Sequence, residues 1–387
     1  MNGAELLRLI LAQVCLHATM AGVRLATPLL ALQQGYSPAA VGVLIALFAL
    51  TQVFLALPAG RFADRHGLKR PLALSVIAAT AGAALVLAFV AALLTGGSTG
   101  ATVIALQRHV GRAAGNPTQL KRVFSWLAIA PAGANFLGPF VAGLLIDHGS
   151  RLWGGTPADL PSFRVCFAVM ALLPLVCWLL VRGVDEPERT PPAAGATPTR
   201  AWDLLREPMF RRLLFVNWLQ SSSWDVHAFV LPVLGHERGL SASVIGSILG
   251  AFAIAAALVR VLLPVLAARA SERSVILSST LVTALVFSVY PLLESPWLMG
   301  LCSVVLGFAL GAVQPMVMSM LHQITPHARH GEALGLRLMT INASSVAMPM
   351  LFGSLGALIG IGGVFWVVGA VVASGARAVW GLRAPPS

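Results

Sequence analysis

Long apolar runs alternate with short polar stretches along the whole chain. The run "VGVLIALFALTQVFLALPA" at 41–59 contains no charged residue, and "GRFADRHGLKRP" at 60–71 follows it directly. Because a membrane-spanning helix needs about 20 mostly apolar residues, runs of this length predict spanning helices. Twelve are expected, at 6–32, 38–59, 71–88, 90–111, 124–146, 163–182, 212–234, 241–267, 274–293, 297–321, 333–356 and 361–382.

The second half of the chain repeats the first. Residues 28–49 align without a gap on residues 232–253, at an offset of 204. Further along, Gly96 matches Gly307 at an offset of 211. The change of offset means that the first repeat has lost seven residues around its third and fourth helices, which predicts that one of these helices is unusually short or tilted.

The repeat predicts two parallel six-helix bundles, at 1–182 and 212–387. The stretch between them contains "DEPERTPPAAGATPTR", which is rich in Pro, Ala and Thr. Such a composition does not build a packed core. We therefore expect a linker at 183–211, on the cytoplasmic side.

The composition excludes an ordinary soluble protein. Hydrophobic residues make up 57% of the chain and charged residues 10%, whereas a soluble domain has about a quarter of its residues charged. The net charge of +12 comes from short basic clusters between apolar runs, so no nucleic-acid partner is expected. The four cysteines lie inside apolar runs without metal-ligand spacing, and neither a metal nor a cofactor is expected.

Lysine and arginine are distributed unevenly between the predicted loops. With the N-terminus inside, the inner loops hold most of the basic residues, whereas the outer loops hold only Arg151, Arg164 and Arg238. Positive charge favours the cytoplasmic side of a membrane. We therefore expect a multi-pass protein of a bacterial-type inner (plasma) membrane with both termini cytoplasmic.

The loop after the second predicted helix contains more than basic residues. In "GRFADRHGLKR", Gly60 and Gly67 allow tight turns at the two helix ends. Asp64 can accept hydrogen bonds at a helix N-terminus, where about half a positive charge resides. A loop that only marked the inner side would need the arginines but neither Asp64 nor the glycines.

Twelve helices in two parallel repeats, with this loop, resemble the major facilitator superfamily of secondary transporters, in particular its drug/proton antiporters. The resemblance implies an all-α fold and a conformational latch that holds the two halves in one state. In the second half, Ala268 stands at the position of the aspartate, which predicts a one-sided latch. The latch residues are Gly60, Asp64, Arg65, Gly67, Lys69 and Arg70.

The fifth predicted helix contains "GANFLGPFVAG" at 133–143, which is similar to the Gly-Pro signature of exporters in this family. Gly138, Pro139 and Gly143 match the signature as hinge or packing residues, and two further glycines of the pattern are replaced by alanine. Small residues also permit close helix packing by themselves, and that alternative stays open. In the fourth helix Ala92 replaces the family's arginine, so no proton-coupling role is carried over from that motif.

Asp225 is the one acidic residue well inside a predicted helix. It belongs to "NWLQSSSWDVH", in which Asn217, Gln220, Trp224 and Asp225 recur at three- and four-residue steps. A polar stripe of this kind predicts a water-filled cavity, because ionisable groups are costly in lipid. Asp225 is expected to couple transport to protons or to pair with the substrate; the alternative is a permanent ion pair with an arginine.

Other polar residues inside predicted helices complete the candidate cavity. His17 and Arg24 share a face of the first helix, and the resemblance places Arg24 near Asp225. Arg24 can instead extend to the interface, and His17 can be a packing residue. Arg337 and Gln314 are further candidates, although Arg337 can also belong to the helix end that meets the loop at 60–70.

These features indicate a transporter and not an enzyme. The sequence contains neither a His-Glu-x-x-His motif nor an ATP-binding loop, so transport must use an ion gradient. We expect a monomeric secondary transporter that binds a small organic solute and protons within the lipid bilayer, and that exports the solute by alternating access. The alternatives are proton-coupled uptake of an organic anion, with Arg24 and Arg337 as carboxylate clamps, and a transport-inactive membrane receptor.

Overall fold

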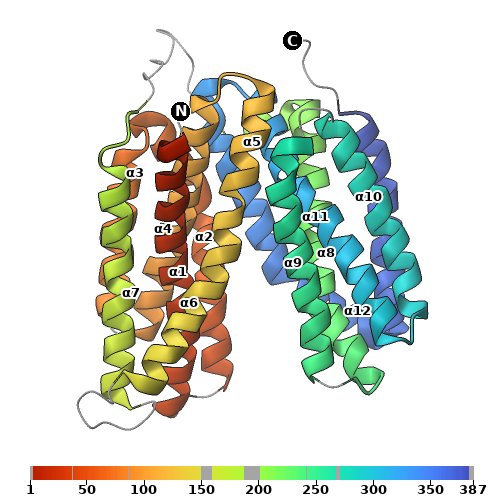
Figure 1. The fold of residues 1–387 in the computed structure, drawn as a ribbon, viewed down its shortest axis with the longest axis horizontal. Helices are drawn as coiled ribbons and strands as arrows, with labels where there is room; N and C mark the ends of the chain where they lie inside the picture. Colours follow the sequence, from red (N-terminus) through yellow and green to blue (C-terminus); the bar gives the residue numbers. More distant parts are fainter. Residues whose placement is uncertain are drawn as a thin grey trace. The chain divides into compact units, whose positions relative to one another are not determined.

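The computed structural model describes residues 3–36, 38–85, 87–149, 159–186, 201–240, 242–266 and 271–382. Every regular element within these ranges is helical (Figure 1). Residues 187–200 of the expected linker and residue 268, at the position of the missing aspartate, lie outside the described ranges.

The chain folds into long helices joined by short turns, and its fold is the expected all-α fold of a multi-pass membrane protein. Eight helices in the described ranges are long and apolar enough to cross a membrane. The elements are α1 (Gly3–Gln33), α2 (Pro38–His66), α3 (Lys69–Ala84), α4 (Ala88–Ala113), α5 (Pro117–Leu127), α6 (Ile129–His148), α7 (Leu160–Val181), η2 (Ala201–Arg206), α8 (Pro208–Glu237), α9 (Ala242–Leu266), α10 (Glu272–Val289), η3 (Tyr290–Leu292), α11 (Pro296–Ile324), η4 (His327–Arg329) and α12 (His330–Trp380).

Each predicted span corresponds to one of these helices, with two differences in continuity. The fifth span begins earlier than expected and is divided at Ala128 into α5 and α6. The last two spans form the single element α12, which is broken only by the non-helical backbone of Gly360 (φ 78°, ψ 160°). The third helix is short, as the repeat predicts: α3 has 16 residues, about 24 Å at 1.5 Å per residue.

The helices form two compact units. Unit 1 contains residues Met1–Ala114, Ile129–Ala196 and His327–Asn342, and unit 2 contains Gly115–Ala128, Thr197–Pro326 and Ala343–Ser387. Each unit therefore includes one short segment that belongs, in chain order, to the other half. In unit 1 this segment is the start of α12, and in unit 2 it is α5.

The internal repeat is visible in the packing of the two units. In unit 1, Gly96 on α4 lies so close to the carbonyl of Phe48 on α2 that a Cβ would collide with it. In unit 2, Gly307 on α11 meets the carbonyl of Phe252 on α9 in the same way. The glycines and phenylalanines are repeat counterparts, so the same helix pair is packed by the same close approach in both units.

Candidate functional site

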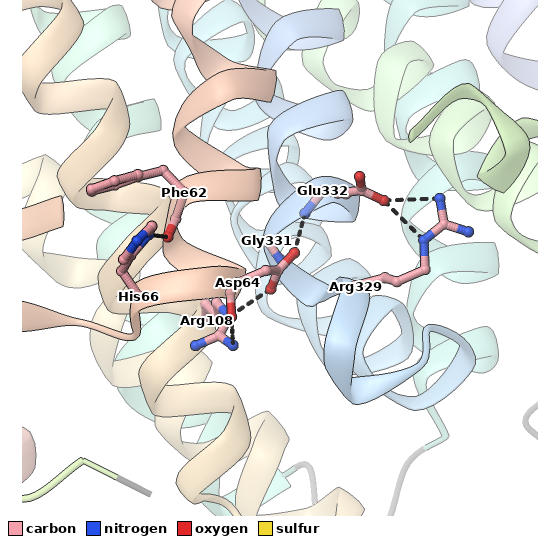
Figure 2. A network of polar contacts seen from close by, with 7 residues as sticks. All are labelled: Phe62, Asp64, His66, Arg108, Arg329, Gly331 and Glu332. Atoms are coloured by element: carbon pink, nitrogen blue, oxygen red, sulfur yellow. Dashed lines mark hydrogen bonds and ion pairs between the residues drawn. The ribbon is translucent and has the colours of Figure 1, made fainter. Parts of the chain in front are cut away.

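Asp64 lies in the last turn of α2 and accepts three hydrogen bonds through its carboxylate (Figure 2). Arg108 Nε lies 2.6 Å from Oδ1, the backbone N–H of Gly331 donates to Oδ1 at 2.9 Å, and that of Glu332 donates to Oδ2 at 3.0 Å. Gly331 and Glu332 belong to the first turn of α12. The carboxylate therefore meets a helix N-terminus, where unpaired N–H groups and the helix dipole favour an anion.

A second ion-pair cluster lies next to this carboxylate. Glu332 Oε1 accepts from Arg61 Nε at 3.0 Å. Glu332 Oε2 lies 2.8 Å from Arg329 (Figure 2). Arg61 is on α2 and Arg329 is in η4. Asp64 and Glu332 thus attach the start of α12 to the end of α2 within unit 1, through both backbone and side-chain groups.

The two glycines of this loop have different roles, and only one of them makes a turn. Gly67 has φ of +76°, which favours glycine, and it separates α2 from α3. Gly60 lies inside α2, so the expectation that it turns the chain is wrong. Its missing side chain instead lets α2 approach the backbone of Gly331, and a Cβ on either glycine would collide with the carbonyl of the other.

The remaining loop residues are not part of the ion-pair cluster. The backbone N–H of Lys69 donates to Glu186 Oε1 at 2.7 Å, so a carboxylate that follows α7 caps the start of α3. Arg65 and Arg70 are exposed. Their positions agree with a basic inner loop, and the latch role of the six residues stays a prediction.

The Gly-Pro signature in α6 is a packing site for α1. A Cβ on Gly138 would lie 2.5 Å from the carbonyl oxygen of Ala18 and 2.9 Å from the backbone nitrogen of Gly22, both on α1. Gly143 has open space around its Cα. Pro139 lies inside α6. The close packing that served as the alternative interpretation accounts for Gly138, whereas nothing in the structure explains Gly143.

Asn217, Gln220, Trp224 and Asp225 all lie on the continuous helix α8, where their three- and four-residue steps place them on one side. Gln220 is buried, and its Nε2 donates to Thr280 on α10 at 2.7 Å. Ser222 bonds to Ser344 on α12 at 3.0 Å. Asn217 is buried as well. Gln220 of the stripe thus contacts a neighbouring helix, and the water-filled cavity expected along the stripe stays a prediction.

Asp225 is half-buried and faces the hydroxyl of Ser345 on α12. The Ser345 Oγ lies 3.4 Å from Oδ1 and 3.3 Å from Oδ2. Among the described residues of unit 2, no basic side chain forms an ion pair with it. A neutral hydroxyl stabilises a carboxylate without neutralising its charge, so Asp225 is available to a proton or a cation.

Trp224, which precedes Asp225 in the chain, lies next to a buried arginine. The Arg260 guanidinium on α9 lies 5.8 Å from the centre of the Trp224 ring, which stands edge-on to Phe252. Arg260 is 9% exposed and donates to the carbonyl oxygens of Gly311 and Ala128. The guanidinium is therefore held inside unit 2 by backbone carbonyls and does not extend to the interface.

A buried chain of hydrogen bonds next to this site was not singled out from the sequence. His227 Nε2 lies 2.9 Å from Ser303 Oγ, which lies 2.8 Å from the Tyr290 hydroxyl, and that hydroxyl donates to the Met299 carbonyl at 3.0 Å. Since a carbonyl only accepts, each hydroxyl must donate in turn, and His227 must carry its proton on Nε2. The sequence contains no spacing that would have identified these partners, which come from three separate elements.

The candidates of the first helix lie in unit 1. His17 is half-buried and bonds to the side chain of Asn135 on α6, and Arg24 is exposed. One turn before His17, Gln13 is buried, and both polar atoms of its side chain are without a hydrogen-bond partner among the described residues. Arg24 belongs to unit 1 and Asp225 to unit 2, and the expected proximity of the two side chains stays a prediction.

Two candidates come from the last helices. Arg337 is buried and belongs to the part of α12 that lies in unit 1, the unit of the loop at 60–70. Gln314 on α11 is half-buried in unit 2. Within the described ranges, no group of three or more His, Cys, Asp or Glu is placed to hold a metal ion.

Comparison with known proteins gives consistent results for sequence and fold. The sequence model of the Major Facilitator Superfamily matches residues 9–222 and 213–387. A tetracycline resistance protein, class D, of Salmonella ordonez is 27% identical over 354 residues, which are 86% of this chain and 85% of that protein. The efflux pump azaK of Aspergillus niger is 28% identical over 167 residues, which are 41% of this chain and 34% of the pump.

Solved structures resemble the fold over nearly the whole chain. The E. coli fucose:proton symporter has a TM-score of 0.78 at 14% identity and covers 99% of this chain and 100% of its own. The human organic anion transporter MFSD10 has a TM-score of 0.75 at 17% identity, with 98% of this chain and 100% of its own covered.

Proposed function

The chain belongs to the Major Facilitator Superfamily, and we propose that this secondary transporter exports a small organic solute in exchange for protons, with Asp225 as the group that carries the proton. The observation on which the proposal rests is the environment of Asp225. A carboxylate inside a membrane helix, with a serine hydroxyl as its hydrogen-bond partner, keeps its capacity to change charge.

The charged and aromatic side chains of α8 and α9 in unit 2 support a site that recognises both charge and aromatic surface. Arg260 lies over Trp224, which precedes Asp225 in the chain. His227 on α8 lies in contact with Phe252 and Tyr290. We therefore expect a solute with a flat ring and a hydrogen-bond donor.

The exchange follows from one change of charge. When the site is open to the outside, Asp225 takes up a proton and loses its attraction for the solute, which leaves. When the site is open to the cytoplasm, Asp225 releases the proton and binds the next solute. A proton that moves down 100 mV supplies about 2.3 kcal/mol, enough for roughly a 50-fold concentration ratio.

Export, and not uptake, is supported by the relatives whose names state a direction. One is a tetracycline resistance protein that aligns over 86% of this chain, and the other is an efflux pump. We place both termini and the attachment of α12 to Asp64 on the cytoplasmic side, in agreement with the basic residues of that loop. In this arrangement the Asp64 cluster holds the cytoplasmic side of the transporter in one state.

Transport into inside-out membrane vesicles tests the proposal. Tetracycline is the first probe, followed by lipophilic cations and aromatic carboxylates. We expect at least one compound to accumulate when the vesicle interior is made acidic. Asp225→Asn should abolish the dependence on the pH gradient, because an amide takes up no proton in this pH range.

The matched control is Glu294→Gln, which changes an exposed acid between η3 and α11 to its amide. This variant should keep the wild-type pH dependence. Wild-type pH dependence in Asp225→Asn would overturn the role of Asp225. Accumulation of carboxylates in right-side-out vesicles, and of no compound in inside-out vesicles, would instead support uptake of an organic anion.

A further inference from the structure

The end of α12 meets the beginnings of two other helices of unit 2. Arg212 on α8 donates through Nη1 to the carbonyl oxygen of Gly381, which directly follows α12, at 3.2 Å. Arg273 on α10 has its guanidinium carbon 4.6 Å from the centre of the ring of Trp380, the last residue of α12. Two arginines from different helices therefore meet two consecutive residues of one helix end.

Helix packing fixes this arrangement. Trp366 on α12 donates through Nε1 to the carbonyl oxygen of Ser288 on α10 at 3.0 Å. Because residue 366 meets residue 288 and residue 380 meets residue 273, α12 runs antiparallel to α10 over this length. On α8, the Leu219 side chain lies where a Cβ on Gly375 of α12 would be. The last turn of α12 is therefore held beside the starts of both helices.

The positive charge at this helix end is not neutralised by acidic side chains. Among the described residues, Arg212, Arg273 and Arg377 form no ion pair. Glu272, next to Arg273 in the chain, is buried and has its Oε2 3.5 Å from Lys121 Nζ. A guanidinium has five N–H donors, and Arg212 uses one of them for a described residue. The arginines thus keep donors for a bound anion.

The surroundings of the arginines fit the edge of a lipid bilayer. Trp380 is 67% exposed and ends the apolar stretch Leu358–Trp380, which is long enough to cross a membrane. Tryptophan at the end of a span is typical of the membrane–water interface. Further along the helices, Leu281 and Leu285 on α10 and Val371 on α12 are exposed. Hydrogen-bond donors at headgroup level are therefore continuous with an apolar surface.

A basic inner loop by itself would not require these contacts. Arginines that only set the orientation of a membrane protein need no defined partner. Arg65 and Arg70, for example, are exposed and lie over no aromatic ring of the described residues. An aromatic ring under a guanidinium fixes its position and leaves the N–H groups in the guanidinium plane available. Arg377 is exposed three residues before Trp380, on the same side of α12.

We propose that Arg212, Arg273, Arg377 and Trp380 form a binding site for the phosphate of an anionic phospholipid, whose acyl chains lie along α10 and α12. Guanidinium groups bind phosphate oxygens through paired N–H donors, and basic pockets between membrane helices bind anionic headgroups. The proposal goes beyond solute export. It requires only that unit 2 lies in a bilayer, and it depends neither on the solute nor on protons.

Native mass spectrometry of the full-length protein in detergent tests the site without solute or a pH gradient. The probes are dioleoyl phosphatidylglycerol and dioleoyl phosphatidylcholine, which have the same acyl chains and differ in net charge. The Kd of the first bound lipid is measured for each. Inorganic phosphate and glycerol 3-phosphate are then added in excess over the bound phosphatidylglycerol, because they carry the phosphate without the acyl chains.

We expect phosphatidylglycerol to bind at least roughly tenfold more tightly than phosphatidylcholine, since each arginine near an anionic headgroup contributes roughly fivefold. Arg212→Gln, Arg273→Gln and Arg377→Gln should each weaken phosphatidylglycerol binding by roughly fivefold. Arg273→Lys should lose less, because an ammonium keeps the charge but not the paired donors. Trp380→Leu should weaken binding by roughly threefold. Excess inorganic phosphate or glycerol 3-phosphate should displace little of the lipid.

The matched control is Arg8→Gln, which removes the same charge from an exposed position near the start of α1, in unit 1. This variant should bind phosphatidylglycerol as the wild type does. Thermal unfolding in detergent checks that each variant is folded. Arg377 has no side-chain contact with another described residue among the hydrogen bonds and ion pairs, so Arg377→Gln tests the site even if Arg273→Gln does not fold.

Three results would overturn the proposal. One is equal affinity of the wild type for the two lipids. Another is equal weakening by Arg8→Gln and by the arginine variants of unit 2, which would reduce the effect to net charge. The third is displacement of phosphatidylglycerol by inorganic phosphate or glycerol 3-phosphate, which would assign the arginines to a soluble anion. A failure of Asp225→Asn to uncouple transport would leave these affinities unchanged, so the two proposals are tested separately.

Discussion

Arg108 and Asp64 form a buried ion pair in which Arg108 Nε lies 2.6 Å from Asp64 Oδ1. The two side chains are 6% and 8% exposed. Arg108 Nη2 also donates to the backbone carbonyl of Asp64 at 3.2 Å. The arginine of α4 therefore orients the carboxylate toward the first turn of α12, and it is not merely a charge at the inner membrane surface.

Removal of one partner of this pair is expected to be costly. Asp64→Ala leaves the Arg108 guanidinium buried without its counter-charge and should lower the stability by about 3–5 kcal/mol. The double variant Asp64→Ala with Arg108→Met should recover part of this loss. Thermal unfolding of the detergent-solubilised protein measures both effects. A double variant less stable than Asp64→Ala would contradict the assignment of the ion pair.

The same variant should separate turnover from affinity. Because Asp64 lies at the end of α2 and contacts the start of α12, Asp64→Ala should slow turnover roughly tenfold or more with little change in the concentration for half-maximal transport. The turnover and the concentration for half-maximal transport are measured with any compound that accumulates in the vesicle assay. A large loss of affinity at normal turnover would refute the latch role.

Two glycines in α6 offer a matched pair of substitutions. Gly138→Ala should destabilise the protein by about 1–3 kcal/mol, because its Cβ would collide with the backbone of α1. Gly143→Ala should be neutral or stabilising by up to about 1 kcal/mol, since nothing lies within 4 Å of its Cβ and alanine favours helix. Thermal stability in the same detergent compares the two. Equal effects would contradict the close packing of α6 on α1.

The buried bond between Gln220 and Thr280 can be tested with a double-mutant cycle. Thr280→Val removes the acceptor of Gln220 Nε2 and should cost about 1–3 kcal/mol, because a buried donor is left unsatisfied. Gln220→Met in the Thr280→Val background should restore part of the stability. Additive losses in the cycle would indicate that the bond does not form.

Loss of a hydroxyl in the middle of the hydrogen-bond chain from His227 to Met299 should lower the stability by a similar amount. Tyr290→Phe removes the hydroxyl that accepts from Ser303 and donates to Met299, and it should cost about 1–3 kcal/mol. Ser303→Ala should cost a comparable amount, and the two losses should not add. Thermal unfolding of the two single variants and the double variant provides the measurement, and full additivity would contradict a continuous chain.

The fold was predictable because it depends on properties that can be read from short stretches of the sequence. Each apolar run of about twenty residues meets the length requirement of one spanning helix. The glycine pairs meet the requirement of one close helix contact, and the offset of 204 shows that both recur in the second half. Gly35 and Gly239, repeat counterparts, both have positive φ, of 83° and 69°. Lipid removes most alternatives to a helix for such runs, since every backbone polar group must be satisfied internally.

The sequence by itself determined the family, the helical repeats, and the acidic residue that meets a helix N-terminus. Only the tertiary structure decided which residues complete each site: Arg108 with Asp64, Ser345 with Asp225, and Lys121 with Glu272. The physical reason is that these partners lie 44, 120 and 151 residues apart, and a helix surface presents several faces. Sequence spacing defines which residues share a face, but the neighbouring helix decides which face is buried and what it meets.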